Sequence, residues 1–412
     1  MKEILFRLAR VHAPIRLVNC AGVLDRLPLY MPGWPAVEVQ TGELGFAGNG
    51  ETPAATLVHN GEMFRISSPR REGARFHKTE VNAVCDLISA LAYARIHSNE
   101  DLLSLHAGAV RINGQLALFP GVAKAGKSTL SAVLSQYGAE VFTDDVLPLV
   151  VQPGAPIFGL ATGIAPRLRL PLPDNIDVAF REFLAASGGP ENSQYKYLPS
   201  QWIAPQGETA PVGAIILLER IDNTQEPTLE PASRGDVLRV LLKQNFSREG
   251  DSGMTLAALH GLASMRPCYR LRYYAPQDAA RLLMDHFNAL PAPDMATYPK
   301  GGPALQGVPA EPAEPIKIEE NQTYGHASHC AEFELEGTFF LASSDRQRIL
   351  HIDEGARRIW HLLRQPASPN EAIEILTAAF PDADAAQIRA DTREIFTRFS
   401  ERGVIAPVGN SG

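Results

Sequence analysis

The sequence predicts an α/β fold for most of its 412 residues. Two strand patterns, Ser104–Ile112 and Gln115–Phe119, flank Asn113-Gly114, which is a strong hairpin signal. A glycine-containing loop then leads into a helical pattern at Ser128–Gln136, and a further strand pattern follows at Glu140–Thr143. Strands and helices that alternate in this way are typical of an α/β domain.

The bulk composition indicates a globular protein. The chain is 45% hydrophobic and 20% charged, and its length allows two or three domains. The net charge of −8 gives no basic excess, so no nucleic-acid partner is expected. No apolar run reaches about 18 residues, so no membrane span is expected. The four cysteines are scattered and the first residues lack a signal-peptide pattern, which together predict a cytoplasmic protein.

Residues 1–100 are predicted to form an N-terminal α/β region that packs on the core. Its strand-like segments are Thr56–His59 and Met63–Ser67, and a helix is expected over Lys78–His97. Residues 101–290 form the second predicted domain, which also contains a β-branched strand at Val212–Leu218 and a helix at Val237–Leu242. Residues 291–315 hold seven prolines among alanines and glycines, which is typical of a linker.

Residues 316–412 are predicted to form a small α+β domain. Strand-like segments are expected at Phe333–Leu341, around Gly337, and at Arg348–Ile352, followed by three helices. The first helix carries an apolar stripe from Ala356 to Leu363, and the second starts with the capping box Ser368-Pro369-Asn370-Glu371. The third is expected to begin near Asp384.

A phosphate-binding loop is the most specific motif in the chain. The segment from Gly121 to Ser128 matches G-x-x-x-x-G-K-[ST] at every fixed position, and it lies between a strand and an apolar-faced helix. The glycines let backbone N–H groups point at phosphate oxygens, Lys127 reaches the β- and γ-phosphates, and Ser128 ligates Mg²⁺. The predicted ATP-binding residues are Gly121, Val122, Ala123, Lys124, Ala125, Gly126, Lys127, Ser128 and Thr129.

An acidic pair follows the next strand. Asp144 and Asp145 come directly after Glu140–Thr143, on the side of the sheet where the nucleotide is expected. One carboxylate can hold Mg²⁺, and the other can deprotonate an attacking hydroxyl. Neighbouring like charges should also raise the pKa of one of the two. An acidic turn that only caps the strand is the structural alternative.

The histidines are less specific. His106, on the strand before the hairpin, suits a satisfied core residue as well as a site residue. His326, His329 and Cys330 lie close together, but without partners elsewhere they indicate a polar loop, and no metal site is predicted there.

The segment from Leu103 to Val110, together with Asn113-Gly114, the P-loop and Asp144-Asp145, resembles the HPr kinase/phosphorylase-related kinases. This group includes kinases that tailor ribosomally made peptides such as lasso peptides. The resemblance implies a P-loop kinase core of the HPr kinase/phosphoenolpyruvate carboxykinase type, with ATP and Mg²⁺ as cofactors. It implies catalytic roles for Lys127, for His106 near the phosphates or acceptor, and for Asp144 as general base, with Asp145 assisting Mg²⁺.

Two departures from that family qualify the resemblance. Ala123-Lys124 replaces the more usual Gly or Ser of the loop, and the Arg-Gly signature of true HPr kinases is absent, so the expected acceptor is a protein or peptide other than HPr. Arg167, Arg169 and Lys196 are candidates to stabilise the transferring charge, although each alone is more typical of a surface cation. Because the relatives form oligomers, a homo-oligomer is also possible.

The C-terminal region resembles the PqqD-type peptide chaperones, on the residues Ile352–Leu363 and more broadly over Glu332–Ile405. The resemblance implies a winged-helix-like unit that binds the leader of a precursor peptide. The leader would add as a strand, with Phe333–Leu341 and Ala356–Leu363 as the two walls. Trp360 and its apolar stripe also suit a plain hydrophobic core.

The parts together predict an ATP-dependent kinase that phosphorylates a serine-type hydroxyl of a precursor peptide or small protein. Two alternatives stay open. In the first, the P-loop is a nucleotide-dependent switch that gates peptide delivery without kinase activity. In the second, the chain is a kinase of a small metabolite and the C-terminal domain is structural.

Overall fold

The computed structural model describes residues 2–43, 51–69, 71–97, 102–122, 124–152, 154–222, 226–245, 252–291, 293–294, 317–328, 330–343 and 348–408. The contacts divide the chain into two compact units. One unit contains the chain as far as Ala232 and the segment that begins at Met265, whereas the other contains the two helices between them and the C-terminal elements. The predicted linker, 291–315, lies almost entirely outside the described residues.

The N-terminal part of the first unit is a six-stranded sheet with strand order β3-β1-β2-β4-β5-β6 among the described residues. Its elements are β1 (Lys2–Leu8), β2 (Ile15–Val18), α1 (Ala21–Tyr30), β3 (Ala36–Glu43), β4 (Ala55–His59), β5 (Phe64–Ser67), β6 (Arg75–His77) and α2 (Glu80–His97). The strands and the helix predicted in this region are therefore confirmed. Helix α2 buries Val84, Leu87 and Leu91 in the core that also holds Phe6 and Leu57 of the sheet.

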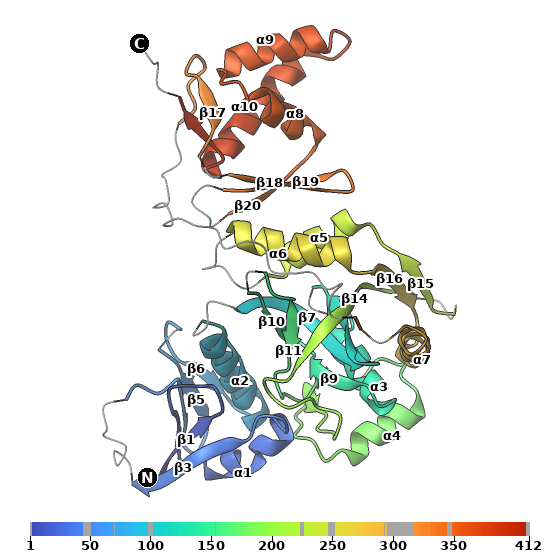
Figure 1. The fold of residues 1–412 in the computed structure, drawn as a ribbon. Coiled ribbons are helices and arrows are strands. Elements are labelled where there is room, and N and C mark those ends of the chain that lie inside the picture. Colours follow the sequence, from blue (N-terminus) through green and yellow to red (C-terminus); the bar gives the residue numbers. More distant parts are fainter. Residues whose placement is uncertain are drawn as a thin grey trace. The chain divides into compact units, whose positions relative to one another are not determined.

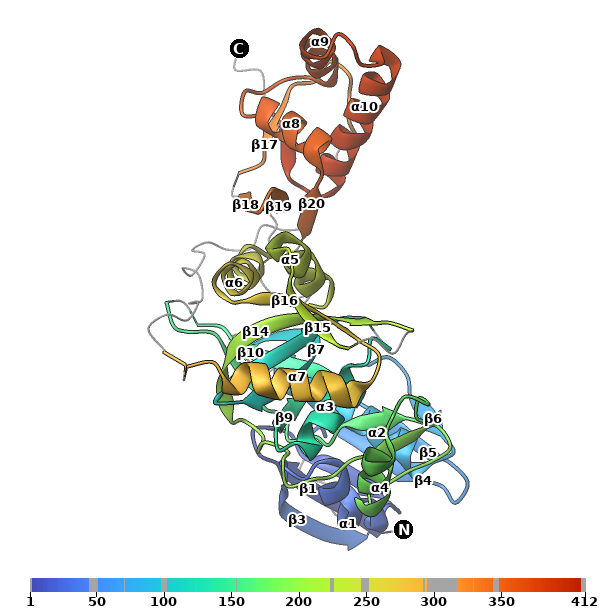
Figure 2. The same ribbon diagram turned by 90° about the vertical axis from the view of Figure 1, so that its right-hand side faces the viewer.

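The second sheet of this unit has eight described strands in the order β11-β10-β7-β8-β14-β16-β15, and β9 pairs with β7 off this path. The strands are β7 (Leu102–Ile112), β8 (Gln115–Pro120), β9 (Glu140–Thr143), β10 (Val146–Val150), β11 (Phe158–Leu160), β14 (Thr209–Arg220), β15 (Thr228–Pro231) and β16 (Cys268–Tyr273). Helices α3 (Lys127–Gln136) and α7 (Pro276–Asn288) lie side by side (Figures 1 and 2). Helix α4 (Val178–Ala186) and the β12 (Arg167–Arg169)–β13 (Tyr195–Tyr197) pair complete the unit. The predicted α/β class is confirmed.

The hairpin β7–β8 explains why the predicted site residues meet. Asn113 and Gly114 have φ values of 48° and 76°, the left-handed conformation that a two-residue hairpin turn requires. Strand β7 pairs with β8 and with β9, both antiparallel, so that Ala107 lies opposite Pro120 and Ala109 lies opposite Thr143. Strands β8 and β9 therefore end at the same edge of the sheet. The P-loop, which follows β8, and the acidic pair, which follows β9, lie beside His106.

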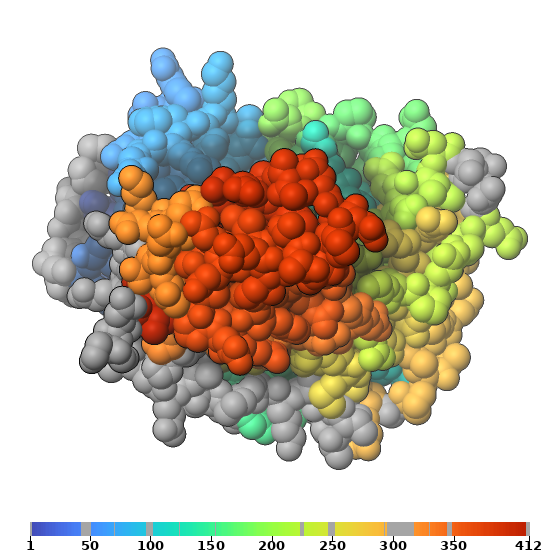
Figure 3. Space-filling model, turned by 90° about the horizontal axis from the view of Figure 1, so that it is seen from above, coloured from blue at the N-terminus to red at the C-terminus, as the bar shows by residue number. Residues whose placement is uncertain are grey.

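The second unit contains α5 (Arg234–Lys243) and α6 (Ser252–Met265), followed by the C-terminal elements. These are β17 (Tyr324–His326), β18 (Ala331–Leu335), β19 (Thr338–Ala342), β20 (Ile349–Ile352), α8 (Glu354–Leu362), α9 (Pro369–Ala379), α10 (Ala385–Glu401) and β21 (Ile405–Pro407). The red and deep orange atoms of Figure 3 belong to this C-terminal segment. The three predicted helices are confirmed, and the capping box between Ser368 and Glu371 is formed in both directions. The winged-helix-like description stays a prediction.

The segment Phe333–Leu341 is a hairpin, which corrects the predicted strand-like segment around Gly337. Glu336 and Gly337 have φ values of 49° and 76°, so the chain turns there between β18 and β19. Strand β19 is then the centre of a three-stranded antiparallel sheet, with β18 on one side and β20 on the other. The prediction was wrong because a turn built on Glu-Gly is a weaker signal than Asn-Gly.

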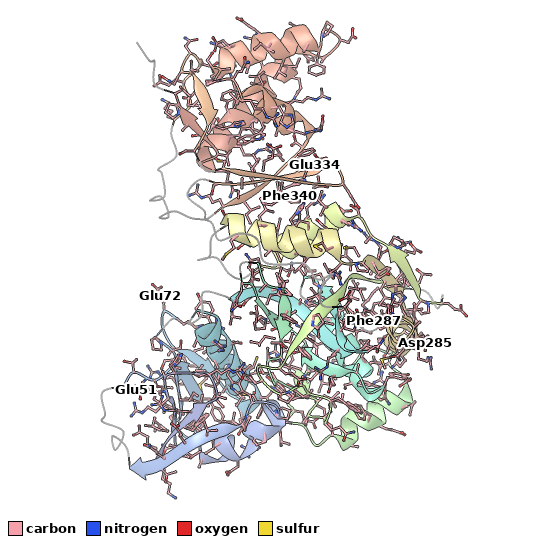
Figure 4. The ribbon with its side chains drawn as sticks, in the orientation of Figure 1. Glu51, Glu72, Asp285, Phe287, Glu334 and Phe340 are labelled. Carbon is pink, nitrogen blue, oxygen red and sulfur yellow. The ribbon has the colours of Figure 1, made fainter. Side chains whose placement is uncertain are left out.

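The hairpin packs on helices α5 and α6 inside the second unit. A Cβ on Gly235 would lie 2.2 Å from Oγ1 of Thr338, so only glycine allows this close approach of α5 to the hairpin. The imidazole of His260, on α6, hydrogen-bonds the carbonyl oxygen of Glu334 over 3.0 Å, and Glu334 and Phe340 lie on the hairpin in Figure 4. The second unit therefore combines two helices of the central sequence with the C-terminal domain.

Candidate functional site

The predicted P-loop has positive backbone φ angles at two of its described residues. Lys124 and Gly126 have φ values of 71° and 102°, and Gly126 is the N-cap residue of α3. A Cβ on Gly126 would lie 2.5 Å from the hydroxyl oxygen of the buried Tyr273, so this position accepts only glycine. Because Gly126 has no side chain to cap the helix, the first N–H groups of α3 suit a bound anion. Ala123 lies outside the described residues.

Lys127 lies in the first turn of α3 and is buried. Its ammonium group donates hydrogen bonds to the carbonyl oxygens of Gly121, at 2.7 Å, and Val122, at 3.1 Å. Burial lowers the pKa of Lys127, and the charges of Asp145 and Asp144 oppose this shift. An ammonium group held by two backbone carbonyls in a poorly solvated place gains strongly from an anionic ligand. The donor set of the loop therefore fits the phosphates of a nucleotide.

Asp144 lies at the end of β9 and is only 6% exposed. Its carboxylate accepts a hydrogen bond from the backbone N–H of Arg167 over 3.0 Å and a second one from the Ser128 hydroxyl. Burial, reinforced by the negative charge of Asp145, raises the pKa of Asp144 from 3.8 to about 6. The expected rise for one member of the acidic pair is therefore present, with burial as its main cause.

Asp145 has the opposite environment. Its side chain is 61% exposed, and its Oδ1 lies 3.0 Å from Nε2 of His106. Partial burial alone would raise the pKa of Asp145, but the hydrogen bond and charge of His106, with Arg167 and Lys127 nearby, lower it overall. His106 is thereby joined to the acidic pair rather than to the core, which resolves the ambiguity of its sequence position.

Only one of the three candidate cations reaches this place. The backbone of Arg167 bonds Asp144, and its guanidinium contacts the Cys85 thiol and lies over the ring of Tyr195 at 4.6 Å. Arg169 is exposed beside the same ring, and Lys196 pairs with Glu191 over 2.7 Å. Arg167 is thus a site residue by position, whereas Arg169 and Lys196 do not line the pocket.

A pocket joins Ser128, the two carboxylates and Arg167, and because it is the candidate active site we call it the catalytic pocket. Its polar lining comes from Ser128, Thr143, Asp144, Asp145, Thr162 and Arg167, and its remaining wall comes from Cys85, Ile88, Ser89, Ala92, Val146, Ile164, Ala165 and Tyr197. Helix α2 of the N-terminal region thus forms one side of the pocket. The sequence analysis missed Cys85 and Tyr197, whose thiol and hydroxyl groups are hydrogen-bonded to each other. Cys85 continues the apolar stripe of α2, and so no local signal distinguishes it from a core residue.

The donors at Ser128 and Asp144 are oxygens, which suits Mg²⁺ better than zinc or other soft metals. Among the described residues, no group of three His, Cys, Asp or Glu side chains is arranged to hold a metal ion. In the C-terminal domain, His326 stacks on Trp360 at 3.6 Å and hydrogen-bonds its carbonyl oxygen, while the Cys330 thiol contacts the carbonyl oxygen of Val404. His329 lies outside the described residues.

The raised pKa of Asp144 predicts a pH-dependent cost to folding. Below about pH 4 the carboxyl is protonated in both the folded and the unfolded chain, so it contributes no cost. As the pH rises through about 6, the folded chain must ionise a buried group. The free energy of unfolding is then lower by roughly 2–3 kcal/mol than in acid. Asp144→Asn should therefore stabilise the metal-free protein at pH 7.5 and not at pH 4, as measured by urea unfolding.

Asp145→Asn is the matched control for this prediction. Because the pKa of Asp145 is lowered in the folded chain, its ionised form favours folding above the ordinary aspartate pKa, and that contribution is lost on acidification. Its replacement should reduce stability at pH 7.5. A gain from Asp144→Asn of equal size at both pH values would contradict the burial argument.

No helix of the described chain combines the length and the apolar character needed to cross a bilayer.

Comparison with known proteins gives two findings. The PqqD family, described as coenzyme PQQ synthesis protein D, matches residues 339–405, which run from β19 to the start of β21. The C-terminal segment therefore contains a PqqD-like domain. No curated protein matches the chain.

Among solved structures, the chain is similar to the Hpr(Ser) kinase/phosphatase from Coxiella burnetii, with 16% sequence identity over 44% of this chain and 95% of that chain. The TM-score is 0.23, which is too low to establish a common fold. The assignment of the site therefore depends on its motif and geometry.

Proposed function

We propose that this chain is an ATP-dependent kinase that phosphorylates a serine-type hydroxyl of a ribosomally made precursor peptide or small protein. The observation that carries the proposal is the convergence of Ser128, two carboxylates and Arg167 on one pocket, with His106 bonded to the carboxylate of Asp145. The PqqD match over residues 339–405 supports a peptide as the acceptor, with the C-terminal domain holding its leader.

The positions of the cations suit phosphoryl transfer, in which the protein chiefly positions the groups and neutralises charge. Lys127 would leave the carbonyl oxygens of Gly121 and Val122 to contact the β- and γ-phosphates. Arg167, beside both carboxylates, is placed to stabilise charge on the transferring group. Ser128 and Asp144 supply the oxygen ligands that Mg²⁺ prefers, and a cation held there neutralises phosphate charge.

The geometry favours a division of roles between the carboxylates that reverses the one implied by the family resemblance. Asp144 is buried and already hydrogen-bonded to Ser128, the P-loop residue expected at the metal, so it suits Mg²⁺. Asp145 is exposed and faces the pocket in contact with His106, so it can reach an incoming hydroxyl. We therefore assign the general base to Asp145, oriented by His106, and the metal to Asp144.

Intact-mass analysis of a candidate precursor peptide, after incubation with the protein, ATP and Mg²⁺, tests the proposal. A gain of one phosphate on a hydroxyl residue is the expected result. If peptides that bind the protein gain no phosphate while ATP is bound, the kinase proposal fails. A nucleotide-dependent switch or a metabolite kinase would then be the better description.

The hairpin geometry narrows the place where a leader strand can add. Strand β19 is hydrogen-bonded on both sides, so that part of the predicted wall Phe333–Leu341 cannot accept a further strand. On the outer side of β18, the carbonyl oxygen of Glu334 is already bonded to His260 of α6. Among the described strands β20 pairs only with β19, and we propose that the leader adds along the outer edge of β20.

Ile349→Pro tests this edge. The N–H of Ser343 bonds the carbonyl oxygen of Arg348, and because such bonds alternate along an antiparallel pair, Ile349 directs its N–H away from β19. Proline at this first residue of β20 removes an outward donor and leaves the β19 pairing intact. We expect the dissociation constant of a labelled precursor peptide to rise about tenfold, measured by fluorescence anisotropy.

Ile349→Ala is the control, since it shortens the side chain but keeps the backbone N–H. If the proline and alanine variants bind the peptide equally well, the main chain of β20 does not take part, and the proposed edge is wrong.

A further inference from the structure

An apolar pocket adjoins the catalytic pocket, and we propose that it is a subsite for an aliphatic side chain of the acceptor, on a residue next to the one that bears the phosphorylated hydroxyl. This inference depends on the proposed kinase function and adds a sequence preference to it. The structure offers three arguments: the continuity of the two pockets, the chemistry of the second one, and the rigidity of its walls.

The two pockets are continuous because they have walls in common. Ala92, Val146, Thr162 and Ile164 line both of them. Adjacent residues of an extended peptide have Cα atoms about 3.8 Å apart, and their side chains point to opposite sides. A small bend in the peptide backbone therefore lets the side chain next to the hydroxyl residue reach the second pocket. A peptide that presents a hydroxyl to Asp145 therefore has this second space beside it.

The chemistry of the second pocket selects its occupant. Trp34, Leu160 and Ala161, all nearly fully buried, line this pocket alone. The indole N–H of Trp34 donates to the carbonyl oxygen of Ala9 over 2.9 Å, so the polar edge of the ring is satisfied and its apolar face remains. Two long polar side chains, Arg95 and Gln206, also contribute to the wall. The mostly aliphatic and aromatic surface favours a branched aliphatic side chain.

The walls are fixed by a close contact between the N-terminal region and the central sheet region. The N–H of Gly33 bonds the carbonyl oxygen of Gly163 over 3.0 Å, and Ala165 bonds the carbonyl oxygen of Tyr30 in the same way. A Cβ on Gly163, whose φ is 73°, would lie 2.6 Å from the carbonyl carbon of Gly33, so both segments depend on glycine here. The segments that carry Trp34, Thr162 and Ile164 are thus held together before any ligand binds, which reduces the cost of binding.

These arguments give the N-terminal region a role in recognition. Trp34 precedes β3, and Ala92 and Arg95 belong to α2, whereas Leu160 and Ala161 come from β11 and the loop after it. The N-terminal region would then form half of the acceptor site, and the P-loop region would supply the other half.

A position-scanning peptide library tests the inference. Each peptide has a central serine and one flanking position fixed to each amino acid in turn, and transfer from radiolabelled ATP is measured with the full-length protein. The wild type should prefer Val, Ile or Leu over Gly at one position adjacent to the serine by about tenfold, the usual range for an apolar group in an apolar pocket. Leu160→Ala enlarges the subsite and should move this preference toward larger side chains.

Two further variants keep the test interpretable. Ala161→Val narrows the same pocket from another side and should move the preference toward smaller side chains. Leu184→Ala removes an equally buried leucine on α4 that lines neither pocket, so it should keep the wild-type preference. ATP binding, measured in parallel, reports whether each variant is folded.

The outcomes separate the two proposals. A library that is phosphorylated without an aliphatic preference, or with one that neither Leu160→Ala nor Ala161→Val changes, overturns the subsite and leaves the kinase intact. A preference for Asp or Glu also overturns it and points to Arg95 instead. A library that gains no phosphate, with ATP bound, overturns the peptide-kinase function itself.

Discussion

Replacement of Lys127 with alanine is expected to reduce the rate of phosphoryl transfer about a hundredfold to a thousandfold. Losses of this size follow the removal of one preorganised group that stabilises charge in a transition state. The buried ammonium group of Lys127 is held by the carbonyl oxygens of Gly121 and Val122, which places it at the mouth of the P-loop. Without this ammonium group, the nearest cation of the loop no longer stabilises the negative charge that develops on the transferring phosphoryl group. The measurement is the rate of phosphate incorporation into a precursor peptide, followed by mass spectrometry.

Lys196→Ala is the matched control for this substitution. Lys196 is also a largely buried lysine of the same unit, but its ammonium group pairs with Glu191 outside the catalytic pocket. Its removal should leave the rate within about twofold, because this ammonium group bonds Glu191 and does not line the catalytic pocket. Equal losses in the two variants would mean that Lys127 acts through stability rather than through the phosphates.

Asp145→Asn is expected to lower kcat by about a hundredfold to ten-thousandfold, the usual contribution of a positioned general base. Asparagine keeps the size of the side chain and can still contact His106, but it cannot accept the proton of the incoming hydroxyl. Because the pKa of Asp145 is lowered, the wild-type carboxylate is ionised throughout the neutral range, and the loss should persist across it. Steady-state kinetics at saturating ATP and Mg²⁺ measure this effect.

The companion variant Asp144→Asn separates the two carboxylates. If Asp144 holds the metal with Ser128, its replacement should raise the Mg²⁺ concentration needed for half-maximal activity, whereas Asp145→Asn should leave that concentration unchanged. The reverse pattern, with Mg²⁺ dependence altered by Asp145→Asn alone, would return the role of base to Asp144.

Short sequence motifs predicted turns and helix starts correctly where the residue types in the motif have a direct effect on the local backbone. Asn113-Gly114 predicted the β7–β8 turn because both residues accept positive φ, and Ser368 with Glu371 predicted the start of α9 because each side chain bonds the other's backbone N–H. The strand predicted before the Gly121–Ser128 loop and the helix predicted after it were also confirmed, as β8 and α3. These signals act within a few residues of the chain, so the sequence contains them in full.

The rest depends on contacts between distant segments. Cys85 of α2 and Tyr197 of β13 line the same pocket as Thr143 at the end of β9, and neither residue differs locally from a core residue. Arg167 could not be separated from Arg169 by sequence, because both lie on one face of β12 over the ring of Tyr195, and only the contact of the Arg167 backbone N–H with Asp144 distinguishes them. The identities of the site residues were thus partly predictable, and their partners were not.

Helices α5 and α6 have a practical consequence for anyone who wishes to transplant the PqqD-like domain to another protein. A fragment that begins in the proline-rich stretch would lack both helices. The hairpin would then lose its close contact with Gly235 and its hydrogen bond with His260. The portable module is discontinuous in the gene, because two of its helices are encoded before the last strand and helix of the other unit. A working chimaera must bring all of these segments, either by co-transfer or by circular permutation.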